Sequence, residues 1–312
     1  MAVPTQGNAM CDGPEGRKWA WLVPVVRFPV TRIVLAFAAL ALASYLWLMA
    51  QLWVVGMVLQ ALGLAPLQTS WELITLPVAL HLAYVGYVRL VEQRSPAEVA
   101  RAGAVRELAR GIMVGAALPA AVVGLVAALG FYRVVALNPW TSLVPPLAAA
   151  VSNAYMWECL SRGVLLRITE ESLGTWLALL ISSLLVGVLL AFSPSATVVS
   201  TVAILVANLL LGAAYLLTRR LWMAIGIHFA WDFTQLGIFG VSVSGTGAGG
   251  LLEPRLSGPD MISGGSFGVE ASIFAIAIGL ALGAVFLVLA HRRGNFTKPF
   301  WSTRKTPQQY ET

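Results

Sequence analysis

The chain has 312 residues, of which 58% are hydrophobic and only 11% are charged, and its mean hydropathy is +0.81. A soluble fold of this length cannot hide so much apolar surface, so the composition excludes a soluble globular protein and requires a bilayer as the solvent for much of the chain. The net charge of +6 requires no nucleic-acid partner, because basic loops are normal on the cytoplasmic face of membrane proteins.

Eight apolar runs are long enough to cross a bilayer. They cover residues 33–55, 72–91, 111–131, 143–168, 175–192, 198–217, 221–240 and 270–290. Backbone groups in lipid must be hydrogen-bonded within the protein, and runs of this length without alternation are typical of helices. The sequence therefore predicts an all-α integral membrane protein with about eight transmembrane helices and the lipid bilayer as its first partner.

The lysines and arginines divide unequally between the two sides of this arrangement. Eighteen of the 20 fall in the two tails and in the connections on the same side, and only Arg133 and Arg255 fall on the other side. Cytoplasmic segments carry an excess of basic residues, so the division predicts that both termini are cytoplasmic.

The spans suggest one membrane domain over residues 30–293, between a cytoplasmic tail over 1–29 and a cytoplasmic disordered tail over 294–312. Residues 241–268 form the longest connection, a glycine-rich exterior loop. No internal repeat is visible, which argues against a secondary transporter. Cys11 and Cys159 lie too far apart in depth to form a disulfide, and neither has the spacing of a metal ligand.

Ionisable residues inside membrane helices are costly and usually have a function. Glu158 and Arg162 are spaced i and i+4 on the fourth predicted helix, which allows an internal ion pair. His228 and Asp232 repeat this spacing on the seventh helix. We expect these four residues, with Asn153 and Asn208 nearby, to face a common pocket nearer the cytoplasmic side than the exterior.

Two apolar residues are expected at one depth in the membrane. Acidic residues followed by a glycine at 171–174 predict a turn between the fourth and fifth helices. If the chain is reflected about Leu173, Trp157 and Leu190 fall at nearly the same height of an antiparallel helical pair.

The motif around Glu158, Arg162 and Gly163 resembles the first motif of the CPBP family, the CAAX-prenyl-protease and bacteriocin-processing type of intramembrane endopeptidase. That motif has two adjacent glutamates, three variable residues, then arginine and glycine. His228-x-x-x-Asp232 is similar to the third motif of the family. The resemblance covers about residues 143–272 and is to bacterial members, which implies a multi-pass protein of the bacterial inner (plasma) membrane.

Two departures from the family fall on the half of the site that activates water. The resemblance implies that the first glutamate of the pair is the base and that a histidine in the second motif assists it. This chain has Trp157 in place of the glutamate and Leu190 in place of the histidine, with Val186 at the other position of the second motif. Glu158, Arg162, His228 and Asp232 are the retained motif positions, which we expect to be catalytically vestigial.

Glu158 is one residue further along the helix, which rotates its side chain by about 100° away from the position of the base. Unless the helix is distorted, we expect it to leave the pocket wall. His228, Asp232 and Glu158 are also ligand types for zinc or manganese, but the set is one histidine short of a usual trio. We expect no cofactor, and either metal only if the protein is an active peptidase.

Three functions stay open at this point. The first is a non-catalytic scaffold or regulator, a pseudoenzyme that binds membrane-embedded peptides or proteins. The second is an active intramembrane endopeptidase with an altered set of residues. The third is a small-solute transporter, which the absence of repeats and of a polar stripe through several helices disfavours.

Overall fold

The structure is a computed structural model, and it describes residues 28–63, 68–247 and 249–303. Most of these residues are helical. The α-helices are α3 (Pro29–Ala50), α4 (Gly56–Ala61), α5 (Gln68–Leu90), α6 (Ala104–Ala128), α7 (Val144–Glu158), α8 (Arg167–Ala191), α9 (Val198–Thr218), α10 (Leu221–Asp232), α11 (Asp260–Ser263) and α12 (Ile273–Arg292). Three π-helices interrupt or extend them, at Gln51–Val55, Cys159–Leu166 and Phe233–Ile238. Short 3₁₀ turns occupy Ala97–Val99, Trp140–Leu143, Val269–Ala271 and Phe300–Thr303.

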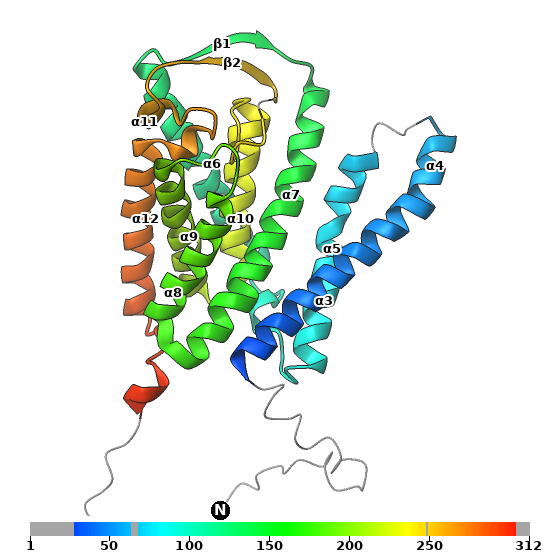
Figure 1. The fold of residues 1–312 in the computed structure, drawn as a ribbon, viewed down its shortest axis with the longest axis vertical. Helices are drawn as coiled ribbons and strands as arrows, with labels where there is room; N and C mark the ends of the chain where they lie inside the picture. The colour runs from blue at the N-terminus through cyan, green and yellow to red at the C-terminus, as the bar shows by residue number, and fades with distance from the viewer. Residues whose placement is uncertain (1–27, 64–67, 248, 304–312) are drawn as a thin grey trace, which may run out of the picture.

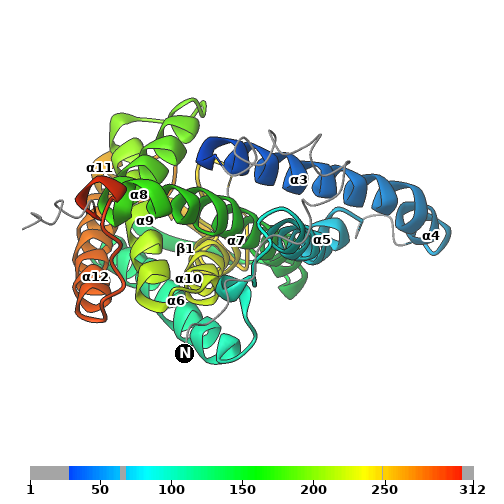
Figure 2. The ribbon, with the colours of Figure 1, turned by 90° about the horizontal axis from the view of Figure 1, so that it is seen from below.

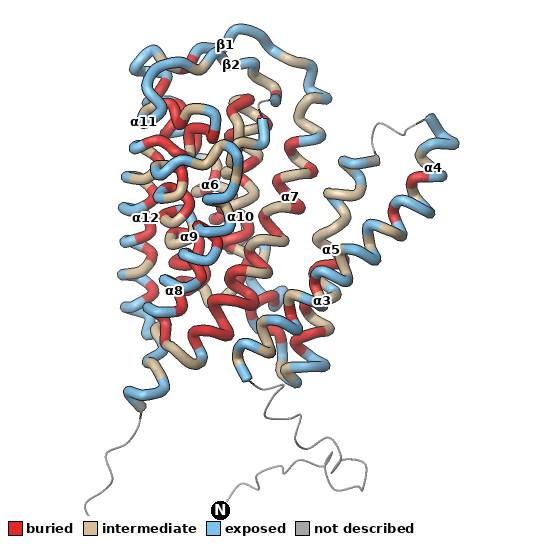
Figure 3. Tube along the Cα trace, in the orientation of Figure 1, coloured by how far each residue is buried: buried red, intermediate tan, exposed pale blue. Residues whose placement is uncertain are grey.

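Helices α6 to α10 and α12 form a bundle, and α3, α4 and α5 project from one side of it (Figures 1 and 2). The start of α3 and the end of α12 lie at one end of the bundle, which we call the terminal end. The strands β1 (Tyr132–Leu137) and β2 (Leu252–Leu256) cross the opposite end, the strand end (Figure 1). The buried residues concentrate in the centre of the bundle, whereas the projecting α4 is mostly exposed (Figure 3).

Six helical stretches of the described residues are long and apolar enough to cross a membrane. The longest, Trp140–Ala191, contains Gly174 at φ 75° and ψ 169°, and α7 and α8 reverse direction there (Figure 1). Helix α10 has only 12 residues and continues as the π-helix Phe233–Ile238. The all-α membrane class is confirmed, while the count of eight crossings and the cytoplasmic position of both termini stay predictions.

The two strands were not predicted from the sequence. They pair in an antiparallel register in which Arg133 faces Arg255 and Leu137 faces Leu252. The strands are short, and β1 shows no alternation, because every one of its residues after Tyr132 is exposed. Pairing with β1 holds Leu252–Leu256, within the predicted exterior loop 241–268, across the strand end of the bundle.

Glycines allow α6 and α10 to pack closely. A Cβ atom at Gly115 would lie 2.2 Å from the backbone oxygen of Ile227, and one at Gly111 would lie 2.4 Å from that of Met223. Small residues four apart are typical of close helix contacts in membranes. Because α10 carries His228 and Asp232, this contact helps to fix the position of both side chains.

The prediction that residues 294–312 form a disordered tail is wrong for residues 294–303, which the structure describes. Asn295 donates from Nδ2 to the carbonyl of Leu216 at 2.8 Å, and Thr297 exchanges backbone and side-chain hydrogen bonds with Thr175. Phe296 packs against the main hydrophobic core. The segment is polar on average, but these few residues satisfy helix-end carbonyls and cover apolar surface. Residues 304–312 and the predicted tail up to residue 27, with Cys11, lie outside the described residues.

Candidate functional site

A cavity of about 1040 Å³ lies within the bundle. Its walls are mainly apolar residues of α7, α8, α9 and α12, and its lining includes Leu73 and Leu76 of α5. Asn138, Ser142 and Ser244 line it at the strand end. The cavity therefore extends toward the strand end, and the expectation of a pocket nearer the side of the termini was wrong.

Three of the four predicted ionisable residues line this cavity: Arg162, His228 and Asp232. The fourth, Glu158, is fully buried behind them. Its Oε1 lies 2.8 Å from Nδ1 of His228 and accepts a hydrogen bond of 3.1 Å from Arg162. The structure thus brings all four residues together, with Glu158 in contact with both a cation and the imidazole.

The remaining polar contacts hold the cluster to neighbouring helices. Arg162 donates to the backbone oxygen and to Oδ1 of Asn208 on α9, at 2.8 and 3.0 Å. Asn153 of α7 donates to Oδ2 of Asp232 at 2.6 Å, and this oxygen lies 3.7 Å from Nε2 of His228. The second carboxylate oxygen of Glu158 is buried and has no hydrogen-bond partner among the residues that the structure describes.

Glu158 lies outside the lining of the cavity and still contacts His228. Trp157 and Glu158 both belong to α7, so the rotation of about 100° between neighbouring helix positions separates their side chains. Directly after Glu158 the helix changes to a π-helix, from Cys159 to Leu166. Such π-helices are frequent at functional sites. A second π-helix begins directly after Asp232.

Trp157 and Leu190 lie in an apolar environment. Both pack against a cluster formed by Val186, Ile204, Phe267 and Ala271, and both line the cavity. Trp157 of α7 and Leu190 of α8 thus pack against one shared cluster. The positions at which the family resemblance implies a water-activating glutamate and histidine are occupied by an indole and a hydrocarbon side chain.

Glu270 is a site residue that the sequence patterns did not indicate. It lines the cavity, and its Oε1 accepts hydrogen bonds from the backbone nitrogen and the hydroxyl of Ser244, at 2.7 and 3.0 Å. Burial, together with the neighbouring Asp232 carboxylate, raises the pKa of Glu270 to about 7. The sequence places Glu270 at the start of the predicted helix 270–290, whereas the structure has it in the 3₁₀ turn Val269–Ala271. The available signal was its position inside the segment 143–272 that resembles the family.

The arrangement of the side chains also bears on metal binding. Over residues 28–63, 68–247 and 249–303, no three His, Cys, Asp or Glu residues converge in a way that could hold a metal ion. Glu158, His228 and Asp232 do not form a common ligand set, because Glu158 is already bound by Arg162. Cys159 is a free, buried thiol.

Comparison with known protein families gives one match. Residues 139–234 match the family model of the type II CAAX prenyl endopeptidases, Rce1-like. The match confirms the family resemblance of the central segment, and it includes α7 to α10 with every predicted site residue. No curated protein and no solved structure matches the chain. The match ends at residue 234, so the resemblance of 235–272 to the family stays a prediction.

Proposed function

Because residues 139–234 match the family model of the Rce1-like type II CAAX prenyl endopeptidases, we propose that this chain is a non-catalytic relative that binds membrane-embedded peptides or proteins without hydrolysing them. One observation carries the proposal. Trp157 and Leu190 pack into the same apolar cluster at the edge of the cavity. An indole and an isobutyl group cannot take a proton from water, so the pair that would activate water in the family is replaced by hydrocarbon surface.

The retained polar residues support the same conclusion because they already bond to one another. The Glu158 oxygen that could act as a base accepts from Arg162 and contacts His228, and Arg162 is also bound to Asn208. A general base must lie within hydrogen-bond reach of the water that it activates. Glu158 does not line the cavity, so it has no access to water bound there.

The cavity suits a hydrophobic ligand with a few polar groups. Pockets with mostly apolar walls and a small number of polar side chains bind ligands by apolar burial and fix their orientation by hydrogen bonds. Here Asn153, His228 and Asp232 supply the polar groups opposite the apolar walls of α8 and α9. An apolar segment of a membrane peptide, with its backbone locally free for hydrogen bonding, has the matching chemistry.

The test restores the missing pair and follows both binding and cleavage. A photo-crosslinking residue at Ala207, which lines the cavity, should capture a prenylated or transmembrane peptide in reconstituted wild-type protein without cleavage. The double variant Trp157→Glu/Leu190→His should gain hydrolysis, while the matched control Trp157→Gln/Leu190→Asn should not. Hydrolysis by wild-type protein that is lost in His228→Ala would overturn the proposal, as would the absence of any captured peptide.

A second candidate is an active endopeptidase with a different base. Two observations favour it: Glu158 contacts His228 at 2.8 Å, and Glu270 lines the cavity with a pKa raised to about 7. In that case a carboxylate of the cavity would replace the lost glutamate. Wild-type turnover that disappears in Glu270→Gln but persists in Glu253→Gln, an exposed control on β2, would establish this candidate.

The proposal includes a location: a multi-pass protein of a bacterial inner (plasma) membrane, with the terminal end in the cytoplasm. The division of the basic residues supports it. A single cysteine at Arg101, an exposed residue, should be labelled only from the cytoplasmic side, and cysteines at Asn138 and Gly249 only from the exterior. Labelling of Gly249→Cys from the cytoplasmic side would overturn this orientation.

A further inference from the structure

We propose that Tyr84 is a positioning residue for the candidate site. Its hydroxyl holds the π-helix Cys159–Leu166 in the orientation that directs Glu158 and Arg162 toward His228. It thereby connects a network of ion pairs at the terminal end of the bundle to the cavity. The inference rests on the proposed function, because what Tyr84 positions is the proposed binding site.

Tyr84 is fully buried in α5 and reaches the π-helix directly. The single proton of its hydroxyl is shared between two acceptors, the backbone oxygen of Gly163 at 2.9 Å and the carboxylate of Glu98. The Gly163 oxygen accepts a second hydrogen bond, of 2.7 Å, from Nε of Arg167. Two side chains from different parts of the chain therefore hold one carbonyl in the middle of the π-helix.

The close approach of the ring depends on glycine at position 163. A Cβ atom there would lie 3.2 Å from three atoms of the Tyr84 side chain, including the hydroxyl oxygen. Any larger residue would push the ring away from the π-helix or turn the helix about its axis. The pair of Tyr84 and Gly163 thus fits one rotational position of the π-helix.

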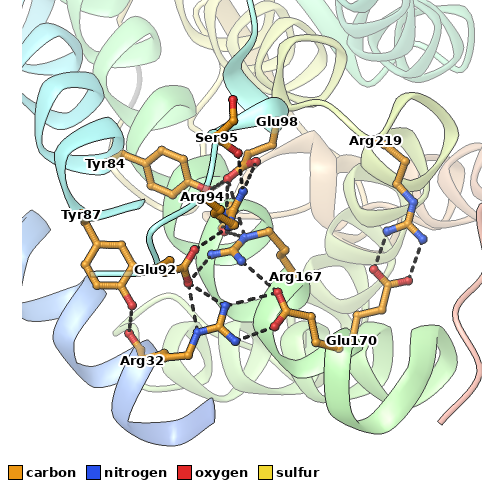
Figure 4. A network of polar contacts seen from close by, with 12 residues as sticks. Arg32, Tyr84, Tyr87, Glu92, Arg94, Ser95, Glu98, Arg167, Glu170 and Arg219 are labelled. Atoms are coloured by element: carbon orange, nitrogen blue, oxygen red, sulfur yellow. Dashed lines mark hydrogen bonds and ion pairs between the residues drawn. The ribbon is translucent and has the colours of Figure 1, made fainter. Parts of the chain in front are cut away.

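The network behind Tyr84 is extensive (Figure 4). Glu98 accepts from Arg94 at 2.6 and 2.9 Å, and Glu92 accepts from Arg32, Arg94 and Arg167 at 2.8 to 2.9 Å. Burial opposes ionisation of Glu98, but the hydrogen bonds from Arg94 and Tyr84 leave the pKa of its carboxyl below the ordinary value. Tyr84 is therefore anchored by a charged group that is itself fixed by arginines.

The connection to the site runs along a single helix. Glu158 is the last residue of α7, directly before the π-helix, and Arg162 lies within it, one residue before Gly163. A rotation of the π-helix about its axis would move both side chains relative to His228 on α10. Loss of the Tyr84 hydroxyl is expected to permit such a rotation, while leaving the apolar packing of its ring in place.

The experiment compares Tyr84→Phe with Tyr87→Phe in full-length protein that carries Cys11→Ser. Tyr87 is a matched control, because its hydroxyl donates to the Arg32 carbonyl, at 2.7 Å, and not to the carbonyl of Gly163. Cys159, the first residue of the π-helix, is buried and becomes the only cysteine. The rate at which N-ethylmaleimide alkylates Cys159 should rise roughly tenfold in Tyr84→Phe. The reason is that local opening of the π-helix no longer has to break the hydrogen bond of the Tyr84 hydroxyl. The rate should stay unchanged in Tyr87→Phe.

A second readout follows the site itself. In protein labelled with ¹⁵N-histidine, the Nδ1 resonance of His228, identified by its loss in His228→Ala, reports the hydrogen bond to Glu158. It should shift in Tyr84→Phe and not in Tyr87→Phe. General loss of stability would not distinguish the two variants in this way. Neither readout needs a bound peptide, so a failure of the proposed function would leave this result intact.

Equal effects of the two phenylalanine variants, or no change of Cys159 and His228 in Tyr84→Phe, would overturn the inference. If Tyr84→Phe does not fold, Gly163→Ala decides the question, because it displaces the same contact by one methyl group. It should raise the alkylation rate of Cys159 and shift the His228 resonance in the same direction. An unchanged His228 resonance in Gly163→Ala would equally overturn it.

Discussion

Trp157 and Leu190 contact the same apolar cluster from opposite arms of the helical pair α7 and α8. Because both side chains pack against this cluster, the two positions at which the family resemblance implies a glutamate and a histidine are apolar together. A glutamate alone at position 157 would place a carboxylate against Val186 and Ile204, and a histidine alone at 190 would lack its partner. The two positions form one structural unit, so we expect their substitutions to interact energetically.

The first prediction concerns that interaction. Trp157→Glu should lower the free energy of unfolding by about 2 kcal/mol or more, because it buries a carboxylate in apolar surroundings. In the double variant Trp157→Glu/Leu190→His, the imidazole can bond to this carboxylate, so the combined loss should be smaller than the sum by about 1 kcal/mol. Chemical denaturation of the four proteins in detergent measures the coupling. Additive losses would mean that the two side chains do not meet.

The second prediction compares two partners of Glu158. Arg162→Ala should cost about 3–5 kcal/mol, because it leaves the fully buried Glu158 without its cation. His228→Ala removes a neutral or charged partner but keeps the arginine, so its cost should be nearer to about 1 kcal/mol. Thermal melts in detergent check the order. The control Glu158→Gln/Arg162→Ala should recover part of the loss, and a silent Arg162→Ala would contradict the prediction.

The third prediction tests the close contact between α6 and α10. Gly115→Ala should destabilise the protein by roughly 2 kcal/mol, because the new Cβ atom would lie 2.2 Å from the Ile227 oxygen and the helices must separate. Gly124→Ala on the same helix is the control, since a Cβ atom there would meet nothing within 4 Å. It should be neutral or slightly stabilising. If both variants melt at the same temperature, the close approach of α6 and α10 at Gly115 does not contribute to stability.

The fourth prediction concerns pH. The pKa of Glu270 is raised to about 7 by burial and by Asp232, so the folded protein holds this proton more tightly than the unfolded chain. The contribution to stability is complete below the ordinary pKa of a glutamate, about 4.5, and is lost as the pH rises to about 7 and above. Unfolding measured across this range should show the decline, and Glu270→Gln should reduce its slope. Glu253→Gln should leave the slope unchanged.

The membrane class, the positions of most helices and the grouping of the site residues could be predicted from the sequence. Each rested on a simple periodic or compositional rule. Apolar length predicts helices, and spacing of i and i+4 placed Glu158 beside Arg162 and His228 beside Asp232. Reflection about the turn brought Trp157 to Leu190 because helical rise is nearly constant.

The errors arose where local geometry departs from those rules. The π-helix begins directly after Glu158, and no residue type in Cys159–Leu166 identifies a π-helix in advance. Glu270 enters the cavity from the 3₁₀ turn Val269–Ala271, which follows glycines with positive φ, and not from the helix expected to begin at residue 270. Residues 294–303 bind to the bundle through a few specific hydrogen bonds that their average polarity conceals.

The antiparallel strands β1 and β2 also constrain the order of biosynthesis. β1 precedes α7 in the chain and β2 follows α10, so the ladder can form only after the four intervening helices have been made and inserted. Only α11 and α12 follow β2 in the chain, so the ladder joins segments made early and late in synthesis. Its register places Arg133 directly opposite Arg255, both exposed, and like charges in this arrangement repel. The pairing of the two strands should consequently be weakest in dilute salt and should tighten as ionic strength screens the two guanidinium groups.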